Sequence, residues 1–159
     1  MATAPRQVGQ VEASTSAAGM QPVGTLPGGL SSDAIGINDL GEIVGTSDSG
    51  NVNTPHGVLW NSRGVVQDLG ILAGGSWSRA FAINVPGTVV GHGNCTGSGS
   101  HAFVWAAKSG MQDLNSFIPA NSGWELLEAV AINVAGQIVG VGTVNAAQHS
   151  FLLTPQCAP

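Results

Sequence analysis

The chain has 159 residues, of which 43% are hydrophobic, 8% are charged and 24 are glycine. This composition is typical of a glycine-rich all-β domain and excludes a disordered chain, which needs more charge and fewer apolar residues. The formal net charge of -5, with four Lys and Arg in all, argues against nucleic acid and anionic membrane surfaces as partners. No apolar run approaches the roughly 20 residues of a membrane span.

Residues 1–18 read as a polar N-terminal extension, and residues 19–159 as a single domain. The extension lacks the positive n-region and the apolar core of a signal peptide. No segment shows the apolar spacing and caps of a helix, so the domain is expected to consist of strands.

A twelve-residue pattern recurs along the domain, beginning at Ala34, Ala80 and Ala129. Such self-similarity indicates one supersecondary unit that is copied and packed against its neighbours. The pattern predicts three repeats, at about 27–72, 73–118 and 119–155.

Each repeat is predicted to contain four strands, which in the second repeat pass through 80–83, 89–91, 101–105 and 110–114. The turn between the first two strands begins with Asn and has Gly three residues later. Gly41, Gly87 and Gly136 are therefore expected at positive φ. Pro86 predicts a different turn in the second repeat, of type II and centred on Pro86 and Gly87.

The third repeat ends after its third strand, and the start of the domain carries a spare fourth strand. Gly19-Met20-Gln21 resembles Gly110-Met111-Gln112 in its pattern. Residues 19–26 are therefore predicted to form a closing strand for the last repeat, either of the same chain or of another. Cys95 and Cys157 are the two cysteines, and the sequence leaves open whether they form a disulfide.

Three segments together, 101–105 (His-Ala-Phe-Val-Trp), 68–75 and 83–91, resemble the HAF repeat family of extracellular bacterial proteins. The resemblance covers roughly residues 21–155. It implies a secreted, propeller-like repeat protein, whose signal peptide is not present in this chain, and it implies no reaction. Two segments depart from the family pattern: 56–60 lacks its Ala-Phe pair, and 149–153 lacks its tryptophan.

Four short strands in about 45 residues are typical of a β-propeller blade. Propellers typically have 4 to 8 blades, so three blades would be expected to join a second copy in a six-bladed ring. A β-trefoil or β-prism with internal threefold symmetry would need no partner, and the repeat pattern leaves this alternative open.

The repeated histidines, His56, His101 and His149, are expected to open the third strand and to form hydrogen bonds, for instance with Asp68 or Asp113. A metal site is not expected, since residues in different blades do not converge. The chain shows no nucleophile elbow, phosphate loop or zinc-binding spacing, so we expect neither an enzyme nor a cofactor.

Trp60 and Trp105 end third strands and are expected in the core. Trp77 and Trp124 each follow a glycine-containing turn before a first strand, as loop aromatics of sugar-binding proteins do. They are the candidate ligand-binding residues. The resulting hypothesis is a non-enzymatic extracellular binding module for carbohydrate or a cell-surface partner, present as a homodimer or larger homo-oligomer. The alternative is a structural protein that self-assembles through strand edges.

Overall fold

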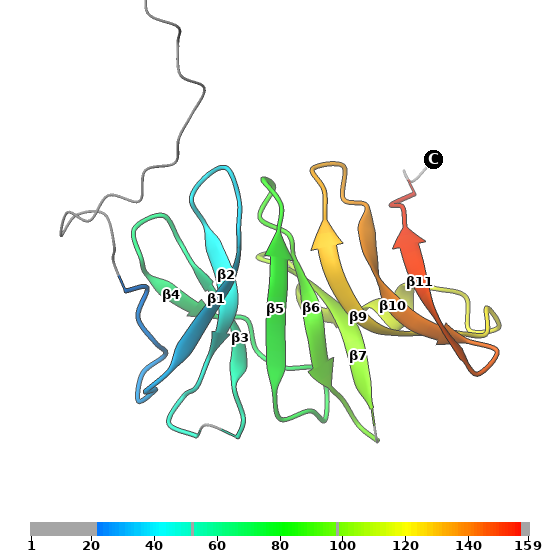
Figure 1. The fold of residues 1–159 in the computed structure, drawn as a ribbon, viewed down its shortest axis with the longest axis horizontal. Coiled ribbons are helices and arrows are strands. Elements are labelled where there is room, and N and C mark those ends of the chain that lie inside the picture. Colours follow the sequence, from blue (N-terminus) through cyan, green and yellow to red (C-terminus); the bar gives the residue numbers. More distant parts are fainter. Residues whose placement is uncertain (1–21, 52, 98, 157–159) are drawn as a thin grey trace, which may run out of the picture.

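A computed structural model describes residues 22–156 except 52 and 98, and these residues form three antiparallel β-sheets side by side (Figure 1). The first sheet contains β1 (Ser32–Ile37), β2 (Ile43–Ser47), β3 (His56–Trp60) and β4 (Val66–Asp68). The second contains β5 (Ser78–Ile83), β6 (Val89–Asn94), β7 (Ser100–Ala106) and β8 (Gly110–Asp113). The third contains β9 (Trp124–Ile132), β10 (Ile138–Val144) and β11 (Ala147–Leu153). The prediction of an all-β chain is confirmed.

Consecutive strands pair within each sheet, so every sheet is a simple meander of hairpins. The third sheet has three strands among the described residues. One short 3₁₀ helix, η1 (Leu114–Phe117), was not expected from the sequence. Asp113 caps it, because its carboxylate Oδ1 accepts a hydrogen bond from the Asn115 backbone N–H at 2.8 Å.

The predicted closing strand lies partly outside the described residues, as do the N-terminal extension, Cys157 and therefore the question of a disulfide. Its described part, residues 22–26, is not a strand. Val23 and Leu26 pack against the buried side chains of Val58 and Trp60 on the first sheet. The linker before the first sheet thus covers that sheet directly.

The turn between the first two strands has the same geometry in all three sheets. The Gly N–H donates to the Asn carbonyl at 3.0 Å in each, and Gly41, Gly87 and Gly136 have φ of 74°, 82° and 77°. The predicted positive φ is confirmed. The separate type II turn around Pro86 is wrong, because the bond from Gly87 to Asn84 makes Val85 and Pro86 the central residues.

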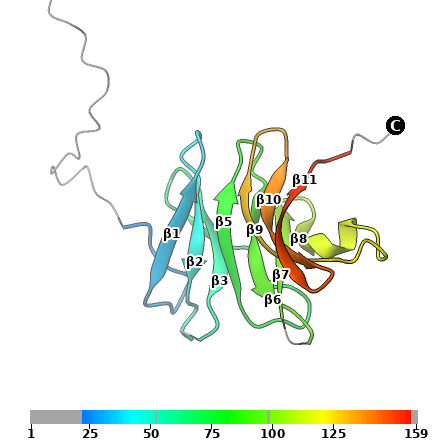
Figure 2. The same cartoon turned by 45° about the vertical axis from the view of Figure 1, so that its right-hand side comes forward.

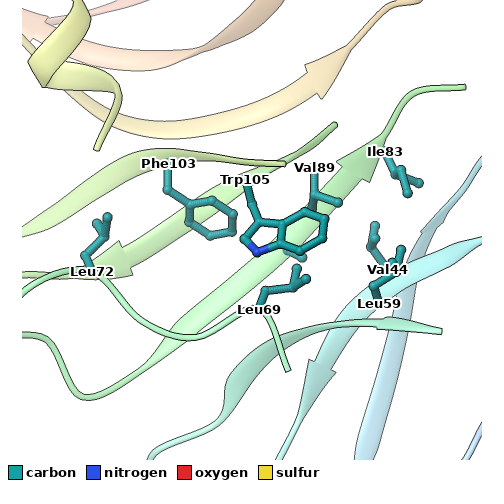
Figure 3. Packing of buried hydrophobic residues seen from close by; sticks show 9 residues of the cluster. Val44, Leu59, Leu69, Leu72, Ile83, Val89, Phe103 and Trp105 are labelled. Carbon is teal, nitrogen blue, oxygen red and sulfur yellow. The ribbon is translucent and has the colours of Figure 1, made fainter. Parts of the chain in front are cut away.

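Apolar side chains fill the space between neighbouring sheets. Between the first and second sheets, Figure 3 shows Trp105 beside Phe103 and Val89, with Val44 and Leu59 of the first sheet facing the same cluster. Trp60 and Trp105 are buried, as the sequence predicted.

Asparagines of the repeated turns also connect the sheets. The Asn38 amide Nδ2 donates to the Asn84 carbonyl, and the Asn84 amide Nδ2 donates to the Asn133 carbonyl, both at 3.0 Å. We call this chain of bonds, through Asn38, Asn84 and Asn133, the asparagine ladder. It joins the corresponding turns of successive sheets by the same hydrogen bond.

Candidate functional site

Trp77 lies at the start of the second sheet, directly before β5. The N–H groups of Ser76 and Trp77 both donate to the Asn94 side-chain oxygen, at 2.8 and 2.9 Å, and Asn94 donates back to the Ser76 hydroxyl. Gly75 lies so close to the Asn94 carbonyl that an added Cβ would stand 2.0 Å from it. The loop is therefore fixed against the end of β6, and Trp77 has a defined position.

An open cavity of about 270 Å³ lies beside this loop, lined by Asn53, Pro55, Trp77, Arg79 and His92. The loop between β2 and β3 supplies Asn53 and Pro55, and the second sheet supplies the other three. The Pro55 carbonyl accepts a hydrogen bond from the Ser78 N–H at 3.0 Å, which holds the two walls together. The cavity is thus built between two repeats.

His92 lines the cavity and packs against the Trp77 ring. Its ring meets the Trp77 ring edge to face, with centroids 5.2 Å apart, and the Phe81 ring lies 5.0 Å away. The Ser100 hydroxyl lies 3.1 Å from His92 Nδ1. Burial lowers the pKa of His92, while the Glu128 carboxylate raises it and Arg79 lowers it again. The net shift favours the neutral form of the ring.

Arg79 supplies the positive charge of the cavity. It pairs with His92 across the β5 and β6 strands, and its side chain is exposed. Among the described residues, no carboxylate forms an ion pair with it. The guanidinium can therefore bind an oxygen of a ligand.

Trp124 does not occupy the position in the third sheet that Trp77 occupies in the second. Leu126 lies opposite Gly142, as Ser78 lies opposite Gly93, because a bulge in β9 adds one residue. Glu125 therefore takes the place of Trp77. Trp124 packs against the core between the second and third sheets and meets the His149 ring at 6.3 Å.

The first repeat also lacks an aromatic side chain at this place. Ser32 lies opposite Ser47, which puts Ser31 at the position of Trp77 and Leu30 at that of Ser76. The Leu30 N–H donates to Asp48, as the Ser76 N–H does to Asn94. The two candidate ligand-binding residues, Trp77 and Trp124, therefore hold different positions in their repeats. Their spacing already indicates this, since Trp77 lies three residues before Ala80 and Trp124 lies five residues before Ala129.

Two of the three repeated histidines, His56 and His101, bind carboxylates as predicted, whereas His149 lies two residues inside β11 and has no carboxylate partner among the described residues. His56 Nδ1 lies 2.8 Å from Asp68 Oδ2, and His101 Nδ1 lies 2.6 Å from Asp113 Oδ2. Each pair ties the third strand to the fourth. Among the described residues, no group of three or more His, Cys, Asp or Glu side chains is placed to hold a metal ion.

A second cavity, of about 480 Å³ and mostly apolar, lies between the second and third sheets. Its lining includes Val104, Leu114, Ile132, Ile138 and Leu153. Leu153 lies opposite Ile138 as Trp105 lies opposite Val89, so a leucine stands where the second sheet has an indole. The smaller side chain explains the cavity.

Trp77 stands out in the sequence, but Asn53, Pro55, Arg79 and His92, which share its cavity, do not. These residues come from two repeats, and Asp33 and Thr46 stand at the places of Arg79 and His92 in the first repeat, so only the packing of the sheets brings the lining together. Among the described residues there is no helix of the length and apolarity required to cross a membrane.

Comparisons with protein-family models, curated proteins and solved structures find no match, and the HAF resemblance stays a prediction.

Proposed function

We propose that this chain is a non-enzymatic, extracellular binding module that holds one sugar ring of a carbohydrate in the Trp77 cavity. The observation that carries the proposal is the combination, in one open cavity, of an oriented indole with Arg79, Asn53 and His92. Sugars present an apolar ring face and a rim of hydroxyls, and this lining offers a partner to each.

The size of the cavity and its charge narrow the ligand. Its volume of about 270 Å³ lies just below the range of about 300 to 1,000 Å³ typical of small-molecule sites, which suits a single ring. Arg79 can pair with a carboxylate, so a hexuronic acid should bind more tightly than the matching neutral hexose. Asn53 and His92 supply hydrogen bonds for the hydroxyls.

The test is a glycan array followed by titration calorimetry of the best ligand. Trp77→Ala should weaken binding about 5- to 150-fold, which corresponds to about 1 to 3 kcal/mol, and should leave the melting temperature nearly unchanged. Trp124→Ala is the matched control and should leave affinity unchanged. No glycan bound by the parent, or equal affinity of the parent and Trp77→Ala, would contradict the proposal.

For the architecture we propose propeller-like blades rather than a trefoil or prism. Meanders of four, four and three described strands lie side by side, with the equivalent strands β1, β5 and β9 next to one another, and this arrangement supports the assignment. A self-assembling structural protein is the second candidate function, and the two uncovered sheet faces described next favour it.

A further inference from the structure

The two ends of the row of sheets carry faces that are buried everywhere else in the chain. Figures 1 and 2 place the first and third sheets at opposite ends, with the second between them. The sheets follow one register, so each residue of one repeat can be compared with its equivalents in the other two. The comparison shows what each end lacks.

On the third sheet, the uncovered face belongs to β10 and β11. Val44 and Val90 hold the same position in the first and second sheets, where the next sheet covers them completely, but Val139 is 41% exposed. Likewise Leu59 is 9% exposed, whereas its equivalent Leu152 is 61% exposed. In the first and second sheets this face packs against the next sheet, and in the third sheet it has no such partner among the described residues.

On the first sheet, the uncovered part of the outer face belongs to β1, beside the part of β3 that Val23 and Leu26 cover. Ala80 is fully buried and Ile83 is 6% exposed, because both pack on the preceding sheet. Their equivalents Ala34 and Ile37 are exposed, Ile37 by 68%. On the same side, the buried indole Nε1 of Trp60 has no hydrogen-bond partner among the described residues.

The asparagine ladder points beyond the third sheet, because each amide donates to the turn of the next sheet. The Asn38 amide donates both to Glu42 and to the Asn84 carbonyl of the next sheet. The Asn133 amide donates to Gln137, the equivalent of Glu42, which leaves one N–H for the carbonyl of a following turn.

We propose that the β1 face of one copy packs on the β10–β11 face of a second copy, and so repeats the contact that the chain already makes twice. Ile37 would meet Val139 and Leu152, and the ladder would continue from Asn133 to Asn38 of the second copy. The contact joins two different faces, so it is head to tail, and it closes into a ring when the rotation allows. Two copies give six sheets, within the usual range of propellers.

The test compares Ile37→Glu and Leu152→Glu with Val65→Glu, a control that is 60% exposed at the turn between β3 and β4. Light scattering of the full chain after size exclusion should show an assembly for the parent and for Val65→Glu. Each of the other two should be monomeric with an unchanged circular dichroism spectrum.

Mixing the two monomeric variants distinguishes a head-to-tail contact from a symmetric one. Ile37→Glu keeps an intact β10–β11 face and Leu152→Glu keeps an intact β1 face, so an equimolar mixture should form dimers and nothing larger. A monomeric parent, an unreactive mixture, or self-association of either variant alone would overturn the proposal.

Discussion

The asparagine ladder offers a direct measurement of the contact between sheets, through Asn84→Ala. The Asn84 side chain is 5% exposed, accepts a hydrogen bond from the Thr88 N–H at 2.8 Å and donates one to the Asn133 carbonyl at 3.0 Å. Each bond contributes about 1 kcal/mol net, and a poorly solvated Thr88 N–H adds a further penalty. We expect a loss of about 2 to 4 kcal/mol.

Asn133→Ala is the matched control, since it changes the same residue of the same turn at the end of the row. Among the described residues its side chain bonds only to Gln137, and it is exposed, so water replaces the lost bonds. The expected loss is about 0.5 to 1 kcal/mol. Both changes should be made in the Leu152→Glu background, in which Asn133 faces water.

Urea unfolding followed by tryptophan fluorescence measures both losses, and the melting temperature of Asn84→Ala should fall by roughly 5 to 10 °C. Asn84→Asp then isolates the intersheet bond, because it keeps the acceptor for Thr88 and removes the donor to Asn133. Equal losses at Asn84 and Asn133, or a stable Asn84→Asp variant, would refute the assignment of stability to the ladder.

Three further predictions concern local packing and charge. Leu153→Trp should fill the apolar cavity and stabilise the fold by about 0.5 to 2 kcal/mol in urea unfolding; lower stability would mean that the space does not admit an indole. Gly87→Ala meets no atom within 4 Å, so positive φ alone should cost about 1 to 2 kcal/mol, whereas Gly99→Ala should cost nothing. Because burial lowers the pKa of His92 in the folded state, its stabilising contribution is present above the unfolded pKa of about 6.5 and is lost as pH falls through the folded-state pKa. The loss of stability between pH 7 and mild acid, measured by urea unfolding, should therefore be smaller for His92→Gln than for the parent, and an equal loss would contradict this.

The sequence predicted the strands and turns because alternation and the Asn and Gly positions are local signals. For example, the second strand of the second repeat, β6, was predicted to begin at Val89, where it does begin, but it extends to Asn94 rather than Gly91. The helix η1 was missed because its four residues cannot show helical periodicity.

The candidate site was harder to predict than the fold. Trp77 stood out as a loop aromatic, but Trp124 is not its equivalent, because Trp77 lies three residues before Ala80 and Trp124 lies five residues before the corresponding Ala129. The bulge in β9 then places Glu125 rather than Leu126 at the Trp77 position. The partners of Trp77, such as Asn53 and Arg79, become neighbours only when two repeats pack together.

The residues at the Trp77 position also determine how many of the proposed sugar sites one chain can hold. With Glu125 in the third repeat and Ser31 in the first at the place of Trp77, the described residues contain one such cavity rather than three. Valency is then set by the number of chains that associate, not by the number of repeats. A weak single-ring site would gain avidity on a glycan-coated surface only through assembly, so a change at Ile37 or Leu152 should weaken surface binding without touching the cavity.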